Sequence, residues 1–218
     1  MFQTAATIAV ALLGAAAGAV DSPYYGRPVA PRPEIRAWPL SPGTPHAISP
    51  SRNPDKYCFV KPSCKSDDDA PNILAAFQTC NNGGTVVLDA TYTIGSPLDL
   101  TFLDRVDVVL TGTVKFSTDI NYWVANSFKY TYQTAIAFWR FGGRDVNIYG
   151  GGVGTLDGNG QVWYDAFAAN ASLLRPVLFV LDGLHGGSVT DLHMINSPSV
   201  RSFRDPFSSR LVGVDAGD

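Results

Sequence analysis

The chain has 218 residues, 45% of them hydrophobic, which supports one folded domain of ordinary size rather than a disordered polymer. The net charge is −3, and no basic run is long enough to follow a phosphate backbone, so nucleic acid is excluded as an expected partner. The only glutamate is Glu34, in a proline-rich stretch. Carboxylate chemistry in the folded part must therefore come from aspartates.

Residues 1–20 are expected to be a signal peptide. They contain no charged side chain, and the apolar stretch 5–17 has the length of a signal-peptide core rather than of a membrane span. We therefore expect a secreted, extracellular protein with no membrane partner. The three cysteines, Cys58, Cys64 and Cys80, fit an oxidising compartment in which two of them pair. Asn170 begins the glycosylation sequon Asn-Ala-Ser.

Residues 21–56 carry nine of the fifteen prolines and are predicted to be an extended leader or linker without chemistry. A helix is expected next, because Ile73, Leu74 and Phe77 recur at the spacing of one helical face. The three aspartates 67–69 precede it. They could form a metal cluster, but aspartates at a helix start accept backbone N–H groups, so the capping interpretation is favoured.

Short strand-like runs then recur with turn residues between them and almost no helix. They lie at 85–88, 106–110, 135–138, 146–149, 177–181 and 188–194. Several repeat a phrase in which a polar residue stands between two hydrophobic ones, as at 106–108 and 146–148. Such recurrence is typical of a solenoid, although the irregular period also allows an antiparallel sandwich.

The stretch 146–165 contains three glycines at 150–152 and then Gly-Thr-Leu-Asp-Gly-Asn-Gly-Gln-Val-Trp-Tyr at 154–164. It resembles glycoside hydrolase family 28, the polygalacturonases, which carry G-x-x-D-G-N-G-x-x-W-W/Y in this region. Further phrases resemble the fungal exopolygalacturonase branch, at 68–74, 80–84, 100–103, 121–128 and 174–176. The resemblance covers residues 57–198.

The resemblance implies an all-β fold, a right-handed single-stranded parallel β-helix with a short amino-terminal capping helix. It also implies inverting hydrolysis of α-1,4-linked galacturonic acid in pectin, or polygalacturonic acid, by a monomer that needs no metal or cofactor. In an inverting glycosidase one carboxylic acid protonates the leaving oxygen while a carboxylate on the opposite face activates water. Similarly placed cysteines in the exo branch favour a Cys58–Cys80 disulfide, and pairing of Cys64 with Cys80 stays open.

The family places its catalytic machinery in the phrases Asn-Thr-Asp, Gly-Asp-Asp, Gly-His-Gly and Arg-Ile-Lys. None of the four occurs in this sequence, so no catalytic residue is assigned. His185 is expected in a turn, and His193 at the edge of the core. The remaining acids, Asp104, Asp107, Asp145 and Asp157, have structural turn roles available to them. Trp123, Trp163 and Tyr164 could stack on a sugar but are expected to pack in the core or a cap.

Residues 199–218 depart from the family and lack the strand pattern that should open the next coil. We therefore expect 57–198 to be a partial β-helix domain, truncated at its carboxyl end and without hydrolase activity of its own. One alternative is a non-catalytic secreted β-helix that binds pectin or a protein partner. Others are an exo-rhamnogalacturonan hydrolase and a calcium-dependent pectate lyase, for which the sequence offers no separate acid cluster.

Overall fold

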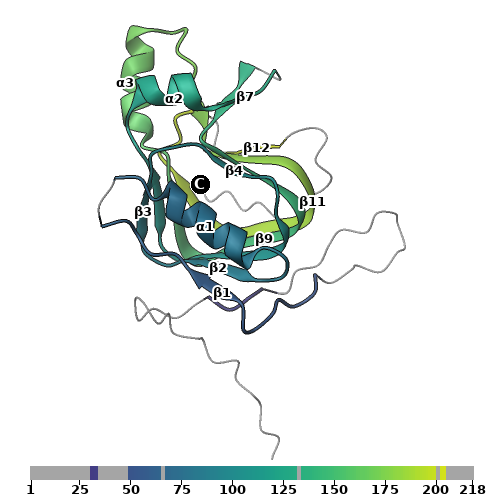
Figure 1. The fold of residues 1–218 in the computed structure, drawn as a ribbon. Coiled ribbons are helices and arrows are strands. Elements are labelled where there is room, and N and C mark those ends of the chain that lie inside the picture. Colours follow the sequence, from purple (N-terminus) through teal and green to yellow (C-terminus); the bar gives the residue numbers. More distant parts are fainter. Residues whose placement is uncertain (1–29, 34–48, 65–66, 132–133, 200–201, 205–218) are drawn as a thin grey trace, which may run out of the picture.

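The computed structural model of the chain describes residues 30–33, 49–64, 67–131, 134–199 and 202–204. Its strands wind as a coil around one core, with helix α1 covering one end (Figure 1). The strands are β1 (Tyr57–Phe59), β2 (Thr85–Leu88), β3 (Thr91–Ile94), β4 (Leu98–Leu100), β5 (Asp104–Leu110), β6 (Thr113–Phe116), β7 (Phe128–Lys129), β8 (Ile136–Ala137), β9 (Trp139–Asp157), β10 (Pro176–Val177), β11 (Phe179–Ile195) and β12 (Ser202–Arg204). The helices are α1 (Ala70–Cys80), α2 (Ile120–Asn126) and α3 (Gly160–Ala169).

Parallel pairing between successive coils builds three stacks of strands. One runs β1–β2–β5 and continues through the middle of β9 and β11. A second joins β3 and β6 to the ends of β9 and β11, and a third joins β4 to the beginning of β9, then β11 and β12. Among the described strands, only the β7–β8 pair is antiparallel. The expected parallel β-helix is confirmed, and an antiparallel sandwich is excluded.

Alternation along each strand explains why these runs form the coil. In β5, Val106, Val108 and Leu110 pack in the main core, whereas Asp107 and Val109 point to the other face. Residues that stack on one another between β5, β9 and β11 are 40 and 41 positions apart. A shorter repeat separates β2 from β5, where Thr85 pairs with Asp107. The sequence period is irregular because helices and β7 are inserted into the longer coils.

The two inserted helices correct the expectation that almost no helix intervenes between the strands. The Asp119 side chain accepts a hydrogen bond from the Tyr122 amide at 3.0 Å and so caps α2. Trp123 of α2 and Trp163 of α3 are both 0% exposed, so each helix is anchored to the core by one tryptophan. Tertiary burial rather than helical periodicity therefore holds these short segments.

The aspartates before α1 act differently from the simple capping that the sequence predicts. Asp69 stands at the N-cap without a side-chain cap bond, and its carboxylate accepts the Thr93 amide at 2.7 Å. Asp68 performs the capping, because its Oδ1 accepts the Ala70 amide at 2.9 Å and also the Gly95 amide at 2.7 Å. These two carboxylates therefore tie the helix start to β3 and to the loop that follows it.

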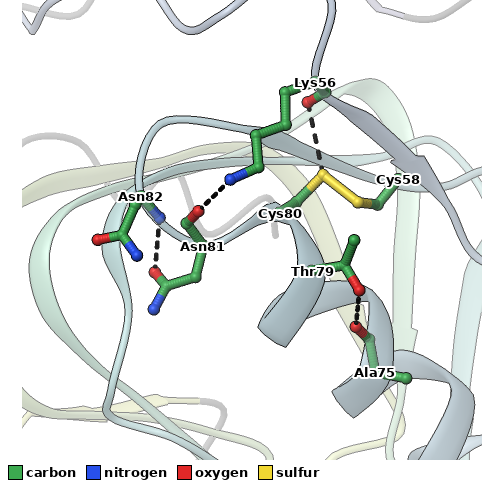
Figure 2. The surroundings of a disulfide bond; sticks show 7 residues. All are labelled: Lys56, Cys58, Ala75, Thr79, Cys80, Asn81 and Asn82. Carbon is green, nitrogen blue, oxygen red and sulfur yellow. Dashed lines mark hydrogen bonds between the residues drawn. A yellow bond between two sulfur atoms is a disulfide. The ribbon is translucent and has the colours of Figure 1, made fainter.

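The amino-terminal end of the coil is stapled by a disulfide between Cys58 and Cys80, whose Cα atoms are 6.0 Å apart. This is the pairing that the sequence favours, and Cys64 is free and exposed. The bond joins β1 to the last residue of α1 (Figure 2). Lys56 donates to the Asn81 carbonyl beside it at 2.6 Å. Helix α1 is thereby fixed over the first coil.

Two expectations about the ends of the domain need correction. Ser202–Arg204 forms β12 and pairs in parallel with Phe179–Leu181, although the sequence there lacks a strand pattern. Backbone pairing with an existing strand requires no apolar alternation, so the pattern alone misses it. Within 21–56, residues 30–33 and 49–56 are described and pack on the coil; the signal-peptide prediction for 1–20 lies outside the described residues.

Candidate functional site

An ion cluster spans the third stack of strands. Asp99 of β4 lies beside Arg140 of β9 in register, and Leu98 and Phe141 next to them are in the core, so both charged side chains face outward. Arg140 donates from Nη2 to Asp99 at 2.7 Å and from Nη1 to Asp182 of β11 at 2.9 Å. One arginine therefore links three successive coils.

Strand β7 and the residue that follows it, Tyr130, supply the aromatic side of this cluster. The Arg140 guanidinium lies 4.5 Å from the centre of the Phe128 ring, a favourable cation–π arrangement. The Tyr130 hydroxyl donates to Asp182 at 3.1 Å. Figure 1 shows β7 beside the stack that contains β4 and β12. The short antiparallel β7–β8 pair is thus attached to the outside of the coil by the same charges that join the coils.

The electrostatics of the cluster keep its charges fixed. Burial raises the pKa of Asp99, but hydrogen bonds from Arg140 and Thr101 lower it by more. The pKa of Asp99 therefore lies below its ordinary value. Burial and the adjacent Asp182 raise the pKa of Tyr130 above its ordinary value. Asp99 therefore stays ionised and Tyr130 protonated near neutral pH. Asp99 is suited to accepting hydrogen bonds and is a poor proton donor for leaving-group departure.

The other aspartates singled out in the sequence are engaged in structural interactions. Asp104 pairs with exposed Arg144 at 2.9 Å. Asp145 has φ 51°, the left-handed conformation expected of a turn aspartate. Asp157 accepts the Asn159 amide and the Asn196 side chain, each at 3.0 Å, and so fixes the turn into α3.

Asp107 is 1% exposed and pairs with Arg52 at 2.9 Å. Asp107 lies inside β5 and not in a turn, and Asp145 lies inside β9, where it adopts the left-handed conformation. Asp157 is the last residue of β9, which agrees with its predicted role in a turn. Asp107 and Asp145 share Arg52, whereas Asp104 and Asp157 have other partners, so the four acids form no single cluster. In the described residues no group of histidine, cysteine or acidic side chains could hold a metal ion.

The two histidines singled out in the sequence, His185 and His193, are both exposed. His185 lies inside β11, between the positive-φ glycines Gly183 and Gly186, and pairs in register with Arg144 of β9. The expected turn between strands is therefore wrong, and an irregular part of one strand takes its place. His193 is exposed rather than at the edge of the core, and its Nε2 donates to the Gly152 carbonyl at 2.9 Å. The sequence missed this because an alternating strand places His193 outward between Leu192 and Met194.

The aromatic candidates separate into buried and exposed groups. Trp123 and Trp163 are fully buried, as expected for packing residues. Tyr164 is 46% exposed, and its hydroxyl donates to the Ser197 carbonyl at 2.8 Å. The Arg175 guanidinium lies 5.3 Å from the centre of the Tyr164 ring and 4.2 Å from that of Phe167. Tyr164 is therefore the exposed member, partly covered by an arginine.

Comparison with known proteins identifies the family of this chain. The model of glycosyl hydrolases family 28 matches residues 87–204, which is more than half of the chain and includes all of β5, β9, β11 and β12. The chain belongs to glycosyl hydrolase family 28. The match continues to Arg204, past the boundary at 198 where the sequence resemblance was expected to end.

Relatives within the family carry the exopolygalacturonase name. Exopolygalacturonase X-2 of Emericella nidulans is 48% identical over 188 residues, which are 86% of this chain and 42% of the relative. Exopolygalacturonase A of Aspergillus niger is 47% identical over 77% of this chain and 38% of the relative. The chain therefore spans about two fifths of the length of the curated relatives it matches.

A solved structure of the family supports the fold. The endo-xylogalacturonan hydrolase of Aspergillus tubingensis superposes with a TM-score of 0.58 at 30% sequence identity, covering 68% of this chain and 39% of that chain. The family's β-helix is therefore present in the described residues. None of the three residues of the Asp99–Arg140–Asp182 cluster was singled out from the sequence. Sequence reasoning missed it because its members lie about forty residues apart and share no motif.

Proposed function

We propose that this chain contributes the amino-terminal coils of a pectin-degrading glycoside hydrolase that releases galacturonic acid from chain ends by hydrolysing α-1,4 linkages. The observation that carries the proposal is the 48% identity to an exopolygalacturonase over 86% of the chain. The 30% identity to an endo-xylogalacturonan hydrolase is lower, which favours the exopolygalacturonase branch.

We further propose that residues 1–218 do not hydrolyse pectin by themselves. Inverting hydrolysis requires an acid and a base on opposite faces of the sugar. The four phrases that the family resemblance associates with this machinery are absent from the sequence. The candidate acid Asp145 and the outward Asp99 have lowered pKa values, and the candidate acid Asp157 is engaged in holding a turn. The outward cluster around Arg140 instead joins coils and fixes β7 beside them.

The same proposal includes export and modification. The uncharged apolar segment 1–20 fits a secretory signal, and the Cys58–Cys80 disulfide fits an oxidising compartment. Asn170 is exposed at the end of α3, and its side-chain oxygen accepts the Ser172 amide at 3.1 Å. An exposed sequon of this kind is accessible to glycosylation.

A chimera tests the substrate and the mode of action. Residues 21–198 of this chain replace the matching part of Aspergillus niger exopolygalacturonase A, and the products from polygalacturonic acid are separated by chromatography. The proposal predicts galacturonic acid as the first product. Oligomers appearing first, or release only from rhamnogalacturonan, would contradict the exo-acting galacturonan assignment. The unmodified relative serves as the control for activity of the carboxyl-terminal part.

A further inference from the structure

The outer face of the first stack carries a column of polar residues that solvent does not reach. Thr85, Asp107, Asn147 and Ser188 occupy equivalent register positions on β2, β5, β9 and β11, and each is at most 3% exposed. Their strand neighbour Val108 points into the core, so by alternation the column faces outward. Another part of the chain must therefore cover it.

The cover consists of residues 30–33 and 49–52, which we call the strap. Arg32 and Arg52, one from each of its two arms, both pair with Asp107, Arg52 at 2.9 Å. Arg32 also donates to the Ser49 hydroxyl at 2.9 Å, which joins the two arms to each other. Arg32 is thereby held on a buried carboxylate that lies 75 residues further along the chain.

A second carboxylate completes the anchorage. Asp145 accepts Arg52 at 2.9 Å and the Ser49 hydroxyl at 2.7 Å. Asn147 donates to Asp107 at 3.1 Å, and its side-chain oxygen accepts the Ser188 hydroxyl at 3.2 Å. The strap is therefore bound directly to two coils, at Asp107 of β5 and Asp145 of β9, and Asn147 extends the network to Ser188 of β11.

The strap also covers an apolar column beside the polar one. Val87, Val109 and Tyr149 follow one another in register on β2, β5 and β9, and are at most 4% exposed. Ala30 packs against this group together with Phe59. Figure 1 draws the short purple segment 30–33 below β1 and β2. The outer face of the coil is thus closed by apolar packing as well as by charge.

Burial of these charges makes the strap more than a surface attachment. The side chains of Arg52 and Asp107 are 4% and 1% exposed. Removing one partner of a buried ion pair leaves an uncompensated charge in a poorly solvated place, which is strongly destabilising. Without the strap, Asp107 would keep only the Asn147 amide among the partners that the described residues provide. The folded coil therefore needs the strap.

We propose that the strap is a permanent part of the folded domain, and that any processing of the exported chain ends before Ala30. Residues 30–33 and 49–52 are then a clamp on the coil rather than part of a leader. Proline at positions 31 and 33 restricts the backbone on both sides of Arg32 and reduces the entropy lost on docking. The strap proposal is independent of catalytic activity.

Cross-linking tests the position of the strap in the full chain. A Cβ added at Gly151 would lie 2.9 Å from the Ala30 Cβ, so Ala30→Cys with Gly151→Cys should form a disulfide under mild oxidation after a small adjustment. Cys64→Ser removes the free thiol from the background. The control pairs Ala30→Cys with Gln78→Cys on the exposed side of α1. Linked peptides only from the first pair support the strap; equal linkage in both pairs overturns it.

Substitution tests how much the strap contributes to stability, and the unfolding equilibrium in urea is the measurement. Arg32→Ala should shift that equilibrium roughly tenfold toward the unfolded state, since Asp107 loses one cation and keeps Arg52. Lys129→Ala, on an exposed position of β7, should leave it unchanged. Equal effects of the two substitutions would contradict the proposal. In a secreting host, mass spectrometry should find the amino terminus before residue 30, and a start at 34 or later in folded protein would also overturn it.

Discussion

Asn147 of β9 lies directly beside Asp107 of β5, and its side-chain amide donates to the buried carboxylate at 3.1 Å while its oxygen accepts the Ser188 hydroxyl. Both residues stand at the polar position of the repeated hydrophobic, polar, hydrophobic phrase. The position that marks the repeat in the sequence is therefore the one that binds successive coils to each other and to the strap.

Replacing Asn147 by alanine should lower the free energy of unfolding by about 1–3 kcal/mol, because Ser188 and Asp107 lose a partner in a site with no access to water. Chemical denaturation followed by far-UV circular dichroism measures the change. Gln78→Ala, at an exposed position of α1, is the matched control and should be neutral. An Asn147 variant as stable as the control would show that the column contributes nothing.

Loss of the disulfide should be costly. Cys58→Ser with Cys80→Ser opens a loop with a sequence separation of 22 residues, which is expected to cost about 3 kcal/mol. The measurement is the urea midpoint of this double variant against the oxidised parent. Cys64→Ser is the control and should behave as the parent, because Cys64 is exposed and unpaired with another cysteine. A large loss in the control instead would point to Cys64 as the bonded residue.

Replacing two buried tryptophans by phenylalanine should lower the stability of the protein by different amounts. Trp139 donates from Nε1 to the Leu178 carbonyl at 2.8 Å, whereas Trp163 Nε1 has no hydrogen-bond partner among the described residues. Trp139→Phe should therefore be less stable than Trp163→Phe by about 1 kcal/mol, the net value of one buried hydrogen bond. Thermal or urea unfolding of the two variants provides the comparison, and the reverse order would be inconsistent with this bonding.

Stability should fall in acid because two partly buried carboxylates, Asp99 and Asp145, have pKa values below those of the unfolded chain. Burial raises the pKa of Asp145, but Arg52, Ser49 and Asn147 together lower it by more. The pKa of Asp99 is also lowered. Their stabilising contribution is complete above the unfolded aspartate value of about 3.9 and is lost as pH falls through the lower folded values. Urea midpoints should be steady from pH 7 to about pH 5 and then decline. Asp145→Asn should flatten part of that decline, and an unchanged slope would contradict the assignment.

Glycosylation at Asn170 should appear when the chain is secreted from a fungal host. Enzymatic removal of N-glycans should reduce the mass of the parent and leave Asn170→Gln unchanged, since Asn170 begins the sequon that the structure leaves exposed. Identical glycan loss from both proteins would place the modification elsewhere.

The sequence predicts the coil best where strands alternate around a buried core. The run 85–88 coincides with β2, and 106–110 falls within β5. In both strands, valine or leucine residues that face the core alternate with residues that face outward. This alternation is visible within a few residues of sequence. Helices α2 and α3 are missed because each is held by one buried tryptophan, a tertiary contact with no periodic trace in so short a segment.

The ion clusters could not be predicted for a related reason. Asp99, Arg140 and Asp182 meet only after the coil has wound, and Arg32 lies in a proline-rich stretch with no apolar pattern. By contrast, the family is readable because residues 154–164 form one continuous phrase. Contiguous motifs are visible in a sequence, whereas contacts between coils depend on the register of the fold.

The most direct test measures hydrolysis by residues 21–218 on polygalacturonic acid, as release of reducing ends, with far-UV circular dichroism of the same sample. The account predicts a β-rich spectrum and no release, with activity restored when the coils are joined to the carboxyl-terminal part of an exopolygalacturonase. Hydrolysis by residues 21–218 alone would contradict it, and would place the catalytic acids among the aspartates of these coils.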